Sequence, residues 1–113
     1  MNVLAAVLVA STSLHITVWP NGEGEAHRWA HTLRCAPSGG TLPHPGTACT
    51  KLAGQAHPFA PTPKGTACTM IYGGPQEALV AGRFRGKLIH ARFDRKNGCE
   101  LGRWIRVRFL FTQ

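Results

Sequence analysis

The sequence predicts an α+β domain of five antiparallel strands with one or two short helices, held by disulfides. Three observations support this prediction. Apolar and polar residues alternate in several short segments, as they do in half-buried strands. Eight prolines and thirteen glycines in 113 residues favour turns over long helices. Four cysteines in so short a chain indicate two disulfides, and therefore an oxidising compartment.

The alternation locates the strands. In the first of them Leu14, Ile16 and Val18 alternate with His15 and Thr17, and Pro20-Asn21-Gly22 ends the segment. The five expected strands cover residues 14–19, 29–35, 78–84, 87–94 and 105–111. Arg85-Gly86 is expected to form a tight hairpin turn between the third and the fourth.

The last expected strand has one apolar face and one mixed face. The first face holds Ile105, Val107, Phe109 and Phe111, and the second holds Trp104, Arg106, Arg108 and Leu110. Because the second face mixes Trp and Leu with arginines, it favours packing against another subunit. A solvated face with scattered apolar groups is the commoner alternative.

The pentapeptide G-T-A-C-T occurs twice, at residues 46–50 and 65–69. In the first copy Thr47 is expected to cap a short helix that carries residues 48–53 and weakens at Gly54. The second copy follows a proline-rich stretch that excludes a helix. The two copies therefore differ in structure, and the first is interpreted as structural.

The N-terminal segment 1–13 is apolar from Val3 to Ala10 and far too short to span a membrane. It is interpreted as a signal-peptide remnant or an N-terminal extension, with a genuine first strand as the alternative. Residues 14–113 are expected to form one domain. No other segment has the length and apolarity to cross a bilayer, so no membrane partner is expected.

The residue inventory argues against an enzyme. The chain has three serines and five carboxylates, and Asp94 is its sole Asp, with no Ser-His-Asp signature around them. A metal site is equally poorly supported, because the cysteines are isolated and only His27 and His31 have a ligand-like spacing. No catalytic residue, metal or cofactor is therefore expected.

The formal net charge is +8, and basic residues interleave with aromatic ones in the C-terminal half. Such interleaving is typical of proteins that hold single-stranded nucleic acid. The basic residues are scattered, however, and a basic soluble surface explains scatter more often. A basic secreted module that binds nucleic acid or an anionic surface is the alternative function, and nucleic acid is the less favoured partner.

The segment Cys68-Thr69-Met70-Ile71-Tyr72 holds no turn former, yet Pro and Gly stretches lie on both sides of it. Its apolar residues would be displayed in extended form, next to a cysteine that can tether them. A serine protease reads such a segment by adding its substrate as a strand. An ordinary edge strand is an equally supported interpretation.

Several stretches together resemble the Streptomyces subtilisin inhibitor family. They are T-L-R-C-A-P, G-T-A-C, C-T-M-I-Y, G-K-L-I-H-A-R-F, N-G-C-E and the closing V-R-F-L-F. The resemblance covers residues 14–111, with the cysteines in the family's order. It implies a secreted, extracellular protein with a five-stranded antiparallel sheet, two short helices on one face, and a homodimer formed through the other face. It also implies inhibition of subtilisin-like serine proteases.

The resemblance assigns roles to individual residues. It pairs Cys35 with Cys49 and Cys68 with Cys99, where the sequence alone allows three pairings. It places the reactive bond at Met70–Ile71, so that Met70 is P1 and Ile71 is P1′. The remaining residues it assigns to the loop are Cys68 (P3), Thr69 (P2), Tyr72 (P2′), Gly73 as a further protease contact, and Asn97 as a support from beneath.

The sequence departs from the family pattern after the tyrosine. The family commonly has Asp-Pro there, whereas this chain has Gly73-Gly74-Pro75. Two glycines loosen the backbone, so the departure is expected to weaken pre-organisation on the primed side and to lower affinity. It leaves the assignment of Met70 as P1 intact.

Overall fold

The computed structural model describes residues 11–113, and the apolar stretch Val3–Ala10 lies outside the described residues. Strand β1 includes Thr12 and Ser13, the last two residues of the expected N-terminal segment. The elements are β1 (Thr12–Trp19), β2 (Trp29–Cys35), α2 (Pro45–Ala53), β3 (Glu77–Phe84), β4 (Lys87–Phe93), α3 (Gly98–Arg106) and the 3-10 turn η1 (Arg108–Leu110). The prediction of an α+β fold is confirmed.

The four strands form one antiparallel sheet in the order β2-β1-β3-β4. Four of the five expected strands are therefore confirmed. The register places Leu14 opposite Leu33, and Ile16 opposite Val80. Because directly paired residues point to the same face, these apolar side chains line one side of the sheet.

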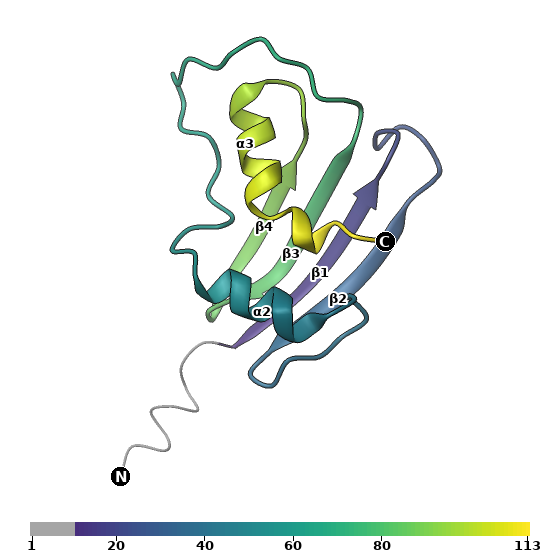
Figure 1. The fold of residues 1–113 in the computed structure, drawn as a ribbon, viewed down its shortest axis with the longest axis vertical. Coiled ribbons are helices and arrows are strands. Elements are labelled where there is room, and N and C mark those ends of the chain that lie inside the picture. Colours follow the sequence, from purple (N-terminus) through teal and green to yellow (C-terminus); the bar gives the residue numbers. More distant parts are fainter. Residues whose placement is uncertain (1–10) are drawn as a thin grey trace.

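Both helices cover that apolar side (Figure 1). The sheet contributes Leu14, Ile16, Val18, Leu33, Val80 and Phe93 to the core, and the helical layer contributes Leu52, Trp104, Val107, Leu110 and Phe111. The core thus lies between the sheet and the layer formed by α2, α3 and the residues that follow α3. The long segment between α2 and β3 passes around the outside of α3 (Figure 1).

The fifth expected strand is wrong, because its residues belong to the end of α3, the turn η1 and the tail after it. The buried residues Trp104, Val107 and Phe111 recur at intervals of three and four, which is the period of a helix. Ile105, expected on the inner face of a strand, is 52% exposed. Trp104 and Leu110 are buried in the core, so neither contributes to an outer sheet face.

The first helix, α2, begins earlier than expected. His44 is its N-cap, without a side-chain hydrogen bond, and Pro45 occupies the first turn, so Thr47 lies inside the helix and not at its cap. Proline favours this position because it lacks the amide hydrogen that a helix leaves unpaired there, and its φ is already helical. Gly54 closes the helix as expected.

The hairpin turn at Arg85-Gly86 is confirmed, with positive φ at both residues (51° and 81°), as a two-residue turn requires. Its Arg85 guanidinium donates to the carbonyl oxygens of Leu52, Gln55 and Ala56 at 2.9–3.1 Å. These groups lie at and just beyond the C-terminus of α2, where carbonyls have no partner within the helix. Arg85 therefore fastens the β3-β4 hairpin to the end of α2.

Both disulfides are as the resemblance implied, Cys35–Cys49 and Cys68–Cys99. The first joins β2 to α2, and the second joins the long segment to the first turn of α3. Within residues 11–113 no helix is long and apolar enough to cross a membrane. The same residues contain no group of three or more His, Cys, Asp or Glu side chains placed to hold a metal ion.

Candidate functional site

Three consecutive side chains project from the long segment before β3. Met70 is 96% exposed, Ile71 57% and Tyr72 65%. Within the described chain, residues 70–72 belong to no strand and make no backbone hydrogen bond. This rules out the interpretation as an edge strand of the sheet. The tripeptide is displayed with its backbone groups free.

Both ends of this tripeptide are fixed to one short segment, residues 95–99. On the N-terminal side the Gly98 amide donates to the Thr69 carbonyl at 2.9 Å. On the C-terminal side the Gly73 amide donates to the Arg95 carbonyl at 2.7 Å. The Arg95 guanidinium returns a bond from Nε to the Gly73 carbonyl at 3.0 Å. The exposed residues thus bridge two anchor points.

The disulfide Cys68–Cys99 adds a covalent link to the same segment, with the two Cα atoms 5.3 Å apart. Cys99 lies in the first turn of α3, directly after the residue that hydrogen-bonds Thr69. The tether and the two anchors therefore all depend on where α3 begins.

Asn97 fixes that position. It is the N-cap of α3, and its side-chain oxygen accepts from the Glu100 amide at 3.0 Å. Asn is among the preferred residues at this position because it satisfies an amide that the helix leaves free. No described hydrogen bond joins the Asn97 side chain to residues 68–73. Asn97 instead positions the neighbouring Gly98, whose amide reaches the loop.

Arg103 fixes α3 to the neighbouring parts of the chain. Its guanidinium donates to the carbonyls of Ala60 and Arg92 at 3.0 Å each, and it pairs with Glu100 at 2.7 Å. Arg103 is buried, and a buried guanidinium is tolerated when its donors are satisfied in this way. Glu100 also accepts from the Thr62 hydroxyl at 2.7 Å. Helix α3 is therefore joined to β4 and to the segment that leads into the loop.

Two glycines let the loop lie close against α3. A Cβ on Gly98 would collide with the Thr69 side chain, and a Cβ on Gly73 would collide with Leu101. Gly73 is therefore packed against α3 and helps to anchor the loop, in addition to giving the backbone flexibility. The loosening expected from Gly73-Gly74 is opposed by the two bonds between Gly73 and Arg95.

The predicted site residues thus form one contiguous unit. Cys68 and Thr69 lead into Met70, Ile71 and Tyr72, Gly73 closes the loop, and Asn97 caps the supporting helix. Sequence reasoning missed Arg95, Gly98 and Leu101, the residues that the loop rests on. The glycine of the N-G-C stretch was the available signal, since glycine permits another segment of the chain to approach the backbone closely.

An extended, exposed and doubly anchored tripeptide suits one kind of recognition. A partner can pair with its free backbone groups as an added strand, while the alternate side chains enter pockets of the partner. Because the loop is already ordered, little conformational entropy is lost on binding.

The chain is similar to known proteins in both sequence and fold. A family model described as "Subtilisin inhibitor-like" matches residues 10–97, more than three quarters of the chain. Among solved structures, the chain is similar to Streptomyces caespitosus sermetstatin, crystallised in complex with Bacillus licheniformis subtilisin. The TM-score is 0.55 at 23% sequence identity, and the match covers 93% of this chain and 99% of that one. No curated protein matches.

Proposed function

The chain belongs to the subtilisin inhibitor-like family, and on that premise we propose that it inhibits subtilisin-type serine proteases by presenting Met70–Ile71 as a substrate-like bond. The observation that carries the proposal is the exposed tripeptide 70–72, held at both ends by residues 95–99. The molecule acts here as an inhibitor and not as an enzyme.

In the proposed complex Met70 is the P1 residue and enters the S1 pocket of the protease. An unbranched apolar side chain that is 96% exposed has no native contacts to lose on transfer into a roomy apolar pocket. Thr69 and Cys68 occupy P2 and P3, and Ile71 and Tyr72 occupy P1′ and P2′. The backbone of these residues pairs with the protease as an added strand.

Inhibition without turnover follows from the way the loop is held. If the protease cleaves Met70–Ile71, the acyl side stays attached to α3 through Cys68–Cys99 and the Thr69–Gly98 bond. The amine side stays attached through Gly73 and Arg95. The Ile71 amine therefore remains beside the acyl carbon at a high effective concentration, and resynthesis of the bond competes with release.

We further propose that the protein acts outside the cell as a homodimer, with residues 14–113 as the inhibitory domain. Two disulfides support an oxidising location. The dimer surface is assigned to the face of the sheet that the helices leave uncovered, which we call the outer sheet face. The register places Leu79 and Leu88 on it, and Leu88 is 76% exposed.

Titration of subtilisin tests the inhibitory function. Activity should fall linearly and reach zero near one inhibitor chain per enzyme. Long incubation at mildly acidic pH should yield some chain with a new N-terminus at Ile71, still joined through Cys68–Cys99. Reduced protein should inhibit poorly and be degraded, because the loop regains its conformational entropy when the tether is lost.

The same titration separates the alternatives. A basic binding module without inhibitory function gives no stoichiometric loss of protease activity and no preferred cut between Met70 and Ile71. Reduced protein that inhibits as well as oxidised protein would leave inhibition standing, but it would contradict the role of the tether.

A further inference from the structure

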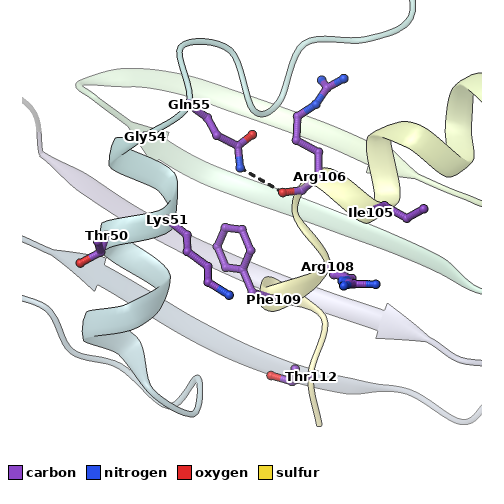
Figure 2. A pocket seen from close by; sticks show the side chains of 9 residues that line it. All are labelled: Thr50, Lys51, Gly54, Gln55, Ile105, Arg106, Arg108, Phe109 and Thr112. Carbon is purple, nitrogen blue, oxygen red and sulfur yellow. Dashed lines mark hydrogen bonds between the residues drawn. The ribbon is translucent and has the colours of Figure 1, made fainter.

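A cavity lies away from the reactive loop, between the end of α2 and the C-terminal segment (Figure 2). Its volume is about 660 Å³, within the range of small-ligand sites. Lys51, Gln55, Ile105, Arg106, Arg108 and Phe109 contribute most of its lining. We propose that this cavity, the α2–tail pocket, binds a compact anion that carries two or more phosphate groups.

The charge of the pocket is of one sign. Lys51, Arg106 and Arg108 line it, and among residues 11–113 no Asp or Glu does so; residues 1–10 contain neither in their sequence. None of the three cations forms an ion pair in the described chain. The carboxylates of Glu23, Glu77 and Glu100 are instead paired with other cations.

The apolar walls of the pocket strengthen the positive electrostatic potential inside it. Phe109 forms one side of the pocket, with the Lys51 ammonium 5.5 Å from the centre of its ring, and Ile105 lies at the rim. A cleft with charges of one sign and walls of low dielectric concentrates the field and attracts counter-ions strongly. The apolar wall therefore raises the affinity of the pocket for an anion above that of cations scattered on an open surface.

The arrangement of the cations indicates how many anionic groups the ligand carries. In Figure 2 the Lys51 and Arg108 side chains lie on the Phe109 side of the pocket, and the Arg106 guanidinium points away on the other side. Between them Gln55 donates from Nε2 to the Arg106 carbonyl at 3.0 Å, which fixes α2 against the end of α3. Lys51 and Arg108 are therefore the cations that a bound ligand meets, and a ligand that contacts both needs an anionic group beside each.

Phosphate suits these residues better than a single carboxylate. Guanidinium groups match phosphate oxygens with paired donors, and lysine supplies a point charge beside them. The pocket also lies at the C-terminal end of α3, about 13 Å along the helix from the residues that hold the loop. Anion binding and protease inhibition therefore use different ends of the molecule and are independent proposals.

Calorimetric titration with tripolyphosphate tests the assignment. Wild-type protein should bind one molecule saturably at low ionic strength, more weakly as salt is added. Replacing Lys51 or Arg108 by Gln should weaken binding about tenfold each, since each change removes a charge-assisted contact. Lys64→Gln removes the same charge from an exposed site outside the pocket and should leave affinity within about twofold.

Three results would overturn the proposal. The first is the absence of saturable binding. The second is an equal loss of affinity in Lys64→Gln, which would mean that net charge alone attracts the probe. The third is equal affinity for a hexaglutamate peptide, which would refute the selectivity for phosphate. Far-UV circular dichroism of each variant checks that the protein is folded, and this check does not depend on the proposed inhibition.

Discussion

At the residue scale, the proposed function makes Met70 the residue that decides which proteases the loop fits. Met70→Lys should weaken inhibition of subtilisin and create inhibition of trypsin, whose S1 pocket holds a carboxylate. The side chain is 96% exposed, so the exchange should leave folding unchanged. Inhibition constants against both enzymes measure the shift, and Met70→Leu serves as the apolar control. An unchanged profile in Met70→Lys would mean that Met70 is not P1.

Arg95 is the residue most responsible for order on the primed side of the loop. Arg95→Gln removes the bond from Nε to the Gly73 carbonyl but keeps the backbone bond between the same two residues. A hydrogen bond from a charged donor contributes about 1.5–3 kcal/mol. The inhibition constant for subtilisin should therefore rise about tenfold or more, and cleavage at Met70–Ile71 should become faster.

The control for this change is Lys64→Gln, which alters a basic residue that makes no described bond to the loop. Equal inhibition by Arg95→Gln and wild-type protein would show that the backbone bond alone holds Gly73 in place.

The candidate site could be predicted from the sequence only in part. Cys68 to Tyr72 lie consecutively, so a resemblance over five residues locates the exposed tripeptide. Arg95 and Gly98 act across a gap of more than twenty residues, by contacts that no local pattern encodes. Their role depends on where α3 begins and on how closely the loop approaches it. These are properties of the tertiary fold.

At the element scale, strands and helices differed in how well the sequence predicted them. Alternation predicted β1 and β2, and the turn signal at Arg85-Gly86 supported the hairpin of β3 and β4. Residues 104–111 also alternate in part, and the alternation was misleading there, because apolar residues on both strand faces also satisfy a helical period. Asn97 followed by Glu100 was the available signal for a helix start.

Arg85 gives the hairpin of β3 and β4 a structural role beyond its turn. Arg85→Asn should lower the free energy of unfolding by about 2 kcal/mol, because up to three bonds from a charged group to the end of α2 are lost. Asn tolerates the positive φ of this residue, so backbone strain does not confound the change. Urea unfolding with disulfides intact measures it.

Lys87→Asn, two residues further along the same hairpin, is the control and should change stability by less than about 0.5 kcal/mol. An equally small effect of Arg85→Asn would show that water replaces the guanidinium at the end of α2 without cost.

At the scale of the whole molecule, the layers separate three surfaces. The reactive tripeptide lies at the N-terminal end of α3, the α2–tail pocket at its C-terminal end, and the outer sheet face on the side without helices. Inhibition does not require the net positive charge of the chain, and the proposed anion binding in the pocket gives part of that charge a function. Separate surfaces allow the pocket and the outer sheet face to be tested by variants that leave the reactive tripeptide intact.

The homodimer is the prediction that belongs to this scale. The outer sheet face exposes Leu88 opposite Arg83 and carries half-buried Leu79 opposite Arg92, four residues along the strand, and such apolar groups gain from burial against a second copy. Light scattering at micromolar concentration should give about twice the chain mass of 12.2 kDa. Leu88→Glu should return the mass to that of one chain, because each copy would then bury a carboxylate at the interface, and its desolvation is costly even beside Arg83.

Ile105→Glu is the matched control, since it places the same charge on an exposed apolar residue of the helical side and should leave the dimer intact. Both variants should still titrate subtilisin one to one, because the reactive loop belongs to neither surface. A mass near 12 kDa for the wild-type protein would contradict the dimer. Such a result would leave inhibition standing, because Met70 and its anchors at Arg95 and Gly98 all come from a single chain.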